Sequence, residues 1–379
     1  MNRPKYLILL AFLLIQFSAT KSQTPNVVVV TLDGVRWQEV FNGAEYSLLT
    51  DEKYSHDTGL MRQQYWHEEA SERRKKLMPF LWNVVSKKGQ LLGNRKFGNK
   101  VTVANLYKIS YPGYNEMFSG KPDWLFIPNL AVRNPRNNVF HYLNNLESYK
   151  GKVAAFCSWQ LFPFILNEKN NAVQVNAGYE ALTGTDSTSV LINEVQEQVK
   201  ERTNTRHDML TYECAKNYMK LHHPKVLYIG LGEADQYAHE GRYDIYLQKL
   251  HQADLMLEEL WYNIQTDPFY KDNTSIVITT DHGRGNKPGN WYTHGFWIKG
   301  SGETWMAAMG PGIEPKGESK DKQQVHLKQL AATISSVLGV HFGQNLSIAA
   351  PIEGLFNDGI EDLQPPKPIV PEMSLIGLK

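Results

Sequence analysis

Short apolar runs that end in turns recur along the chain and predict the strands of a sheet. Each run is rich in Val, Ile, Leu or other apolar residues and stops at polar or glycine residues, as the parallel strands of an α/β sheet do. The clearest runs are Val27–Asp33, Val153–Trp159, Val226–Gly232, Ser275–Asp281 and Trp305–Gly310.

Helical patterns lie between these runs. The strongest extends from Tyr243 to Ile264, where apolar residues recur on one face, and a second helix is expected from Val325 to Leu338. The polar and charged stretch from Glu52 to Lys76 is expected to be a helical excursion near the surface. Alternating strands and helices predict an α/β fold, with a mostly parallel sheet sandwiched by helices.

Residues 1–22 have the pattern of a signal peptide. Arg3 and Lys5 precede an apolar run from Tyr6 to Phe17, and small or polar residues follow up to a possible cleavage point before Gln23. The run is shorter than the about 20 apolar residues that a transmembrane helix needs. An uncleaved anchor and a buried first strand are the alternatives. We expect an exported protein, periplasmic or secreted, without integral membrane association.

The remaining chain is expected to form one elaborated domain, residues 23–363, followed by a Pro-rich tail, residues 364–379. Hydrophobic residues make up 42% and charged residues 21% of the chain, which is ordinary for a globular protein. The formal charge is +1, and it becomes −2 without residues 1–22, which hold three basic and no acidic residues. A chain this close to neutral is not expected to bind nucleic-acid polymers.

Cys157 and Cys214 are the two cysteines of the chain. Two thiols cannot make a disulfide framework, and neither has metal-ligand spacing. We expect both to be buried apolar residues, and the sequence leaves open whether they pair.

Three carboxylates lie at or just beyond the ends of predicted strands: Asp33, Asp235 and Asp281. In an open parallel sheet the ligand site lies beyond the carboxyl ends of the strands, so these side chains should converge. One such aspartate alone would be interpreted as a turn residue or a helix N-cap.

Histidines accompany these carboxylates. His239 follows Asp235 by four residues, so the two share a face if this segment is helical. His282 is adjacent to Asp281, and His294 follows across a loop rich in Gly, Pro and Asn. Imidazole and carboxylate together suit Zn²⁺ and related ions. A solvated helix face is the alternative for Asp235 and His239 by themselves.

Ser110 is the candidate nucleophile. It precedes Tyr111 and Pro112, at a point where a strand-like run leads into a helix-like one. Proline is common in the first turn of a helix, so Ser110 is expected near a helix N-terminus, where N–H groups favour an anion or alkoxide. The alternative is that Ser110 is an N-cap without a catalytic role.

The order of these residues resembles the alkaline phosphatase superfamily, and in particular its nucleotide pyrophosphatase/phosphodiesterase-like branch. There the nucleophile, Thr or Ser, precedes a Tyr/Phe-Pro pair, as Ser110 does here. A Gly ten residues later is matched by Gly120, and a late His-Gly followed by Gly-Pro is matched by His294-Gly295 and Gly310-Pro311. The resemblance extends from Asn26 to Leu338.

The resemblance implies a phosphoric ester hydrolase with two divalent metal ions, for which Zn²⁺ is expected. By position, it implies one metal site made of Asp235, His239 and His294. It implies a second made of Asp33, Asp281, His282 and the Ser110 oxygen. Asn129 is matched to an asparagine that hydrogen-bonds a phosphoryl oxygen. Two divalent cations would balance the three aspartates and a Ser110 alkoxide, so the loaded site is expected to be close to neutral.

The chain also departs from this pattern. Gly113 stands where the branch often has Asn, the gap between His282 and His294 is short, and Lys121, Arg133 and Arg136 are the candidates for binding phosphate. The substrate is expected to be a small phosphate ester, with the choice between monoester and diester open, as is the oligomeric state.

Three other functions are considered. A sulfatase would have Arg four residues after its nucleophile, where Tyr114 stands. A phosphoglycerate-mutase-like metalloenzyme would carry a large inserted domain. A non-catalytic secreted protein that binds metal or phosphate would have no need of an activated hydroxyl at Ser110.

Overall fold

A computed structural model describes residues 25–122, 128–170, 172–343 and 347–356 of the chain. The predicted signal peptide and Pro-rich tail lie outside the described residues. In the described residues, eight strands form one sheet in the order β10-β2-β9-β7-β1-β6-β4-β5. Their bounds are β1 Asn26–Leu32, β2 Gly89–Leu92, β4 Val153–Cys157, β5 Gln174–Ala177, β6 Val226–Leu231, β7 Thr274–Thr279, β9 Met306–Met309 and β10 Gly317–Glu318.

The α/β fold predicted from the apolar runs is confirmed, with one correction. β7, β1, β6, β4 and β5 run parallel in adjacent positions, and β10 is parallel to β2. The run Trp305–Gly310, expected to be a parallel strand, contains β9, which is antiparallel to both β2 and β7. Strand direction follows from the path of the chain between strands, and the apolar pattern of one strand does not contain it.

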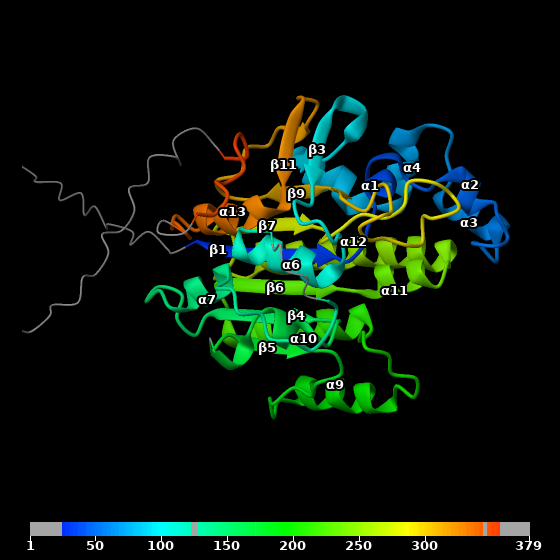
Figure 1. Ribbon diagram of the computed structural model, residues 1–379. Coiled ribbons are helices and arrows are strands. Elements are labelled where there is room, and N and C mark those ends of the chain that lie inside the picture. Colours follow the sequence, from blue (N-terminus) through cyan, green and yellow to red (C-terminus); the bar gives the residue numbers. More distant parts are fainter. Residues whose placement is uncertain (1–24, 123–127, 171, 344–346, 357–379) are drawn as a thin grey trace, which may run out of the picture.

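A second, three-stranded sheet has the order β11-β3-β8 and lies above β9 in the view of Figure 1. Its strands are β3 Asn99–Thr102, β8 Glu303–Thr304 and β11 Gln323–His326. The helix expected from Val325 to Leu338 was predicted to begin too early. Val325 and His326 belong to β11 and pair with β3, and after a 3₁₀ turn at Leu327–Gln329 the helix α13 begins at Leu330.

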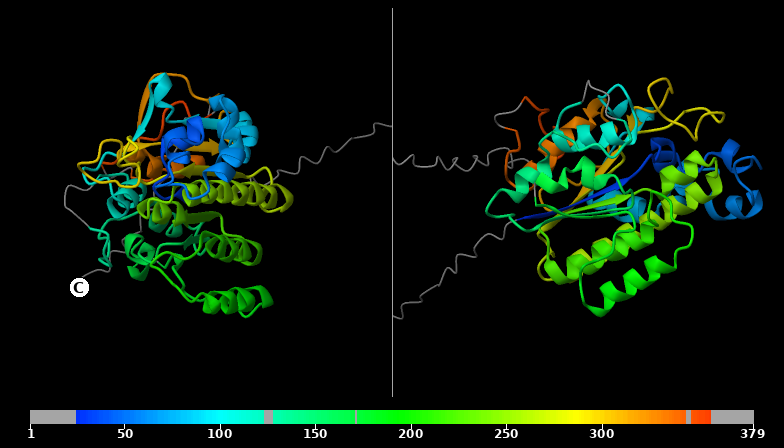
Figure 2. Two further views of the ribbon diagram at one scale, coloured as in Figure 1. Left: turned by 90° about the vertical axis from the view of Figure 1, so that its right-hand side faces the viewer. Right: turned by 60° about the horizontal axis from the view of Figure 1, so that its bottom comes forward.

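Helices cover both faces of the main sheet (Figures 1 and 2). One face packs on the N-terminal helices and on α10 and α12, and the other packs on α6, α7, α8 and α13. Within β1 the side chains alternate between the two cores, with Val28 and Val30 in one and Val27 and Val29 in the other. A strand buried on both faces is apolar throughout, which is why β1 stood out in the sequence.

The helices have the following bounds: α1 Trp37–Asn42, α2 Tyr46–Leu49, α3 Thr58–Tyr65, α4 Ala70–Leu77, α5 Ser86–Lys88, α6 Ser110–Ser119, α7 Val139–Asn144, α8 Phe162–Ile165, α9 Ser187–Gln198, α10 Asp208–His222, α11 Glu233–His239, α12 Tyr243–Thr266 and α13 Leu330–Val337. A π-helical turn covers Leu81–Val85, and further 3₁₀ turns cover Arg95–Phe97 and Glu168–Asn170. The expected excursion from Glu52 to Lys76 contains α3 and most of α4, and the strongest helical pattern became α12.

Cys157 and Cys214 are both buried, and both are free thiols. Among the described residues, we find no helix with the length and apolarity that crossing a bilayer requires.

Candidate active site

The site lies where three neighbouring parallel strands end. β7, β1 and β6 are adjacent in the sheet, and their carboxyl ends meet at one edge (Figure 1). Asp33 follows β1 directly, Asp281 comes two residues after β7, and Asp235 lies in α11, which begins just after β6. Adjacent parallel strands in register bring their ends together, which is the physical reason that carboxylates so far apart in the sequence converge.

The first group of potential ligands surrounds His282. Its Nε2 lies 3.5 Å from an Asp33 oxygen and 3.3 Å from an Asp281 oxygen. Ser110 Oγ is 3.2 Å from the same nitrogen. These are the four residues that the family resemblance assigns to one metal site, and Asp33, Asp281 and His282 could together hold an ion.

The second group surrounds Asp235. His239 Nε2 lies 3.3 Å from one oxygen of Asp235 and 3.0 Å from His294 Nε2. His294 Nε2 is 3.9 Å from the other Asp235 oxygen, which is also 3.8 Å from His282 Nε2. His282 therefore joins the two groups, and Asp235, His282 and His294 form a second cluster that could hold an ion.

The unpaired atoms at the site are those that a cation would need. Asp33 Oδ1 and Asp281 Oδ2 are buried without a hydrogen-bond partner. The Nδ1 of His282 is 3.0 Å from the carbonyl of Gly283, and the Nδ1 of His294 is 3.1 Å from the carbonyl of Lys108. If Nδ1 donates in both contacts, each Nε2 keeps its lone pair for a metal. Buried carboxylate oxygens are rarely left unpaired, so this donor set fits divalent metal ions.

Ser110 is the first residue of α6 and is 4% exposed. The helix approaches the end of β7 closely, because a Cβ on Gly113 would lie 2.6 Å from the carbonyl oxygen of Asp281. A glycine at this position lets the helix that begins at Ser110 lie against the segment that follows β7. Tyr114, one turn after Ser110, donates a hydrogen bond of 2.9 Å to Asp33.

The residues expected to bind phosphate lie in different places. Asn129 Oδ1 accepts a hydrogen bond of 2.9 Å from the backbone N–H of Tyr111, so its side chain lies beside the start of α6. Lys121 lies beyond the other end of this helix, about 15 Å from its start by helical rise. Arg133 lies over the ring of Phe164, 5.2 Å from its centre, while Arg136 is exposed.

Arg284 is a site residue that our sequence reasoning missed. Its guanidinium is fully buried and forms an ion pair with Asp235. It also donates to the carbonyl oxygens of Gly34 at 3.0 Å, Tyr292 at 2.8 Å and Asp235 at 3.1 Å. It thus connects three segments that carry potential ligands. The sequence feature that could have identified Arg284 is its position directly after Asp281-His282-Gly283.

Burial and neighbouring charges shift the pKa values of the three carboxyls in different directions. Burial raises the pKa of Asp281 to about 7, with the charge of Asp235 adding to the effect. Burial also raises the pKa of Asp33, as do the charges of Asp281 and Asp235. Burial opposes ionisation of Asp235 as well, but Arg284 and the neighbouring histidines outweigh it and hold this pKa well below its usual value.

Two of the site's histidines, His282 and His294, are held neutral. Burial lowers the pKa of His282 to about 4, with the positive charge of Arg284 contributing. Burial, followed by the proximity of His282, lowers the pKa of His294 well below its usual value. Neutral imidazole is the form that binds metal ions, so these two side chains could act as ligands at neutral pH.

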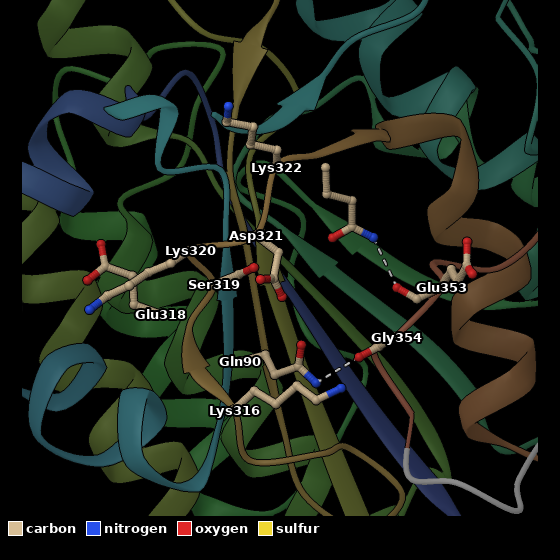
Figure 3. Close-up of a pocket in the computed structure, with 10 residues that line it drawn as sticks. Gln90, Lys316, Glu318, Ser319, Lys320, Asp321, Lys322, Glu353 and Gly354 are labelled. Carbon is tan, nitrogen blue, oxygen red and sulfur yellow. Dashed lines mark hydrogen bonds between the residues drawn. The ribbon is translucent and has the colours of Figure 1, made fainter. Parts of the chain in front are cut away.

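A cavity elsewhere in the fold lacks this chemistry. It measures about 800 Å³ and lies against the edge strand β10 (Figure 3). Lys316, Lys320 and Lys322 line it together with Glu318, Asp321 and Glu353, and Gln90 donates to the carbonyl of Gly354 beside it. It contains charges of both signs and none of the residues that the sequence singled out.

No family model matches the chain, and the search of curated proteins finds no match. Solved structures with similar folds do exist. Wild-type alkaline phosphatase PafA has a TM-score of 0.55 at 11% identity, covering 88% of this chain and 99% of that one. A proposed sulfatase from Bacteroides thetaiotaomicron VPI-5482 has a TM-score of 0.55 at 11% identity, and the match covers 87% of this chain and 72% of that one. Phosphonate monoester hydrolase SpPMH from Silicibacter pomeroyi has a TM-score of 0.53 at 9% identity, and the match covers 86% of this chain and 75% of that one.

Proposed function

Since the chain has the fold of the alkaline phosphatase superfamily, we propose that it is an exported metal-dependent hydrolase of phosphoric esters with Ser110 as nucleophile. The observation that carries the proposal is the position of Ser110 Oγ, 3.2 Å from His282 Nε2 and beside two buried carboxylate oxygens without partners. A serine in an N-cap role would need none of these neighbours. The substrate is a small ester, a monoester or a diester.

The proposed reaction proceeds in two displacements. Two divalent metal ions, expected to be Zn²⁺, would lower the pKa of the Ser110 hydroxyl and stabilise charge on the leaving oxygen. Ser110 passes its proton to water and its Oγ attacks phosphorus; the bond from phosphorus to the ester oxygen breaks, and this oxygen takes up a proton from water and leaves as the alcohol. Water then attacks phosphorus and loses a proton, the bond to Ser110 Oγ breaks and the serine hydroxyl is restored. The product is phosphate from a monoester and a phosphate monoester from a diester. The backbone N–H of Ser110, at the start of α6, and the amide nitrogen of Asn129 would donate to the phosphoryl oxygens.

Arg284 changes the expected charge of the site. Two divalent cations would balance the three aspartates and a Ser110 alkoxide, and the buried guanidinium then adds one positive charge. A site with a net positive charge favours an anionic phosphoryl group and the extra negative charge of its transition state. Phosphoryl transfer depends mainly on positioning and on such stabilisation, which fits a site with few additional acid–base groups.

The test compares Ser110→Ala with a control, Ser119→Ala, at the other end of the same helix. Zinc-loaded wild type is expected to hydrolyse nitrophenyl phosphate or bis-nitrophenyl phosphate, and the ratio of the two rates decides between monoester and diester. Ser110→Ala is expected to retain its metal ions, measured by elemental analysis, and to lose several orders of magnitude in kcat. Retained activity in Ser110→Ala would refute the assignment of Ser110 as the nucleophile. Wild type that hydrolyses neither ester would refute the proposed hydrolysis of phosphoric esters.

A sulfate ester is the second candidate substrate. It is favoured by the similarity in fold to the proposed sulfatase from Bacteroides thetaiotaomicron VPI-5482. The sequence around Ser110 lacks the Arg that the sulfatase motif carries, and Tyr114 stands in its place. Turnover of nitrophenyl sulfate exceeding that of both phosphate esters would decide for the sulfatase.

A further inference from the structure

Two loops beside Ser110 expose large apolar side chains. One extends from Arg284 to Ser301 and presents Trp297, which is 89% exposed, next to Phe296, which is 44% exposed. The other contains Leu130 and Val132, which are 58% and 51% exposed. We call these four residues the apolar rim. Single exposed apolar residues are ordinary, so their position and the rigidity of their loops decide whether they matter.

The loop that carries Trp297 is firmly held. Backbone hydrogen bonds connect Gly285 to Thr293 at 2.9 Å and Asn286 to Lys299 at 3.3 Å. Trp291, six residues before Trp297, is fully buried and packs edge-on against Tyr243. The same loop thus buries one tryptophan in the core and directs another into solvent. Exposure of Trp297 is a feature of an ordered loop and does not arise from loose packing.

Both parts of the rim are connected to the nucleophile. His294, three residues before Trp297, contacts the carbonyl of Lys108, two residues before Ser110. On the other side, the Tyr111 hydroxyl donates to the carbonyl of Val132. The segments that bear the rim are therefore fixed to the residues on either side of Ser110 in the sequence.

We propose that the apolar rim binds the organic part of the substrate, and that the substrate is a phosphate ester carrying an apolar group. This inference rests on the proposed function. An ester bound with its phosphoryl group at Ser110 must extend its organic group out of the ligand cluster, and the rim residues belong to the two loops that are hydrogen-bonded to Lys108 and Tyr111, on either side of Ser110. Burying an apolar group against an exposed tryptophan removes apolar surface of both from water, which favours binding.

The experiment uses nitrophenyl phosphodiesters that share the nitrophenolate leaving group and differ in the second ester group, methyl or phenyl. Wild type is expected to prefer the phenyl ester in kcat/KM. Trp297→Ala is expected to lower kcat/KM for the phenyl ester about tenfold and for the methyl ester less than twofold. If the enzyme prefers monoesters, phenyl and naphthyl phosphates replace the diesters, and the larger naphthyl ester should lose more.

Tyr262→Ala is the matched control, because Tyr262 is an aromatic side chain of α12 that is 66% exposed. It is expected to leave both rates unchanged. Leu130→Ser tests the second loop and should also reduce the preference for the phenyl ester. Equal losses of kcat/KM for both esters, or no loss in Trp297→Ala, would overturn the rim proposal. The second result is also the one expected if Trp297 binds a protein partner instead of the substrate. Wild type inactive on every ester would instead refute the proposed function.

Discussion

Arg284→Gln is expected to lower the free energy of unfolding more in the metal-free protein than in the metal-loaded protein. The guanidinium is buried, pairs with Asp235 and donates to three carbonyl oxygens. Removing one partner of a buried ion pair costs about 3–5 kcal/mol, because the remaining charge is left without compensation. In the proposed site, a bound metal ion would supply a positive charge to Asp235. The loaded variant should then lose only the carbonyl hydrogen bonds, about 1–3 kcal/mol.

Urea unfolding in EDTA and in saturating Zn²⁺ measures the two losses. If the metal-free loss is larger, thermodynamic linkage requires the variant to bind its ions more tightly, by about tenfold for each 1.4 kcal/mol of difference. Arg74→Gln is the control, since Arg74 pairs with Glu318 away from the ligand cluster, and its loss should not depend on metal. Weaker metal binding by Arg284→Gln would refute this electrostatic reasoning and show that Arg284 acts chiefly by holding the ligands in position.

Two further predictions concern single residues. Gly34→Ala would place a Cβ 2.5 Å from an Asp235 oxygen at a backbone φ of +62°, so this variant should have a reduced metal content. Gly151→Ala is the control, because its φ is +69° and no atom lies within 4 Å of the added Cβ. It should lose only about 1–2 kcal/mol of stability through backbone strain. Equal metal content in the two variants would contradict the steric argument. Burial raises the pKa of Asp254 to about 7, so between about pH 4 and 7 the folded state keeps a proton that the unfolded state loses. Wild-type stability relative to Asp254→Asn, from urea unfolding, should therefore be greatest near pH 4 and fall towards pH 7; a flat difference would count against the shift.

Much of the candidate site could be predicted because its residues are close in sequence or lie at comparable ends of strands. Asp281 and His282 are adjacent, and Asp235 and His239 are four residues apart on one helix. The roles assigned to these residues remain predictions. The position of His282 could not be predicted from local patterns, because this residue contacts both groups of potential ligands and its neighbours lie beyond the ends of three different strands.

Periodicity in the sequence by itself determined the α/β class, the main parallel strands and the convergence of Asp33, Asp235 and Asp281. These follow from local patterns, because burial on both faces makes a strand apolar and parallel strands end at one edge. Only the tertiary structure decided the antiparallel direction of β9, the approach of Ser110 to His282 across 172 residues, and the burial of Arg284 against Asp235. These depend on the path of the chain and on packing between distant segments. No local pattern records them.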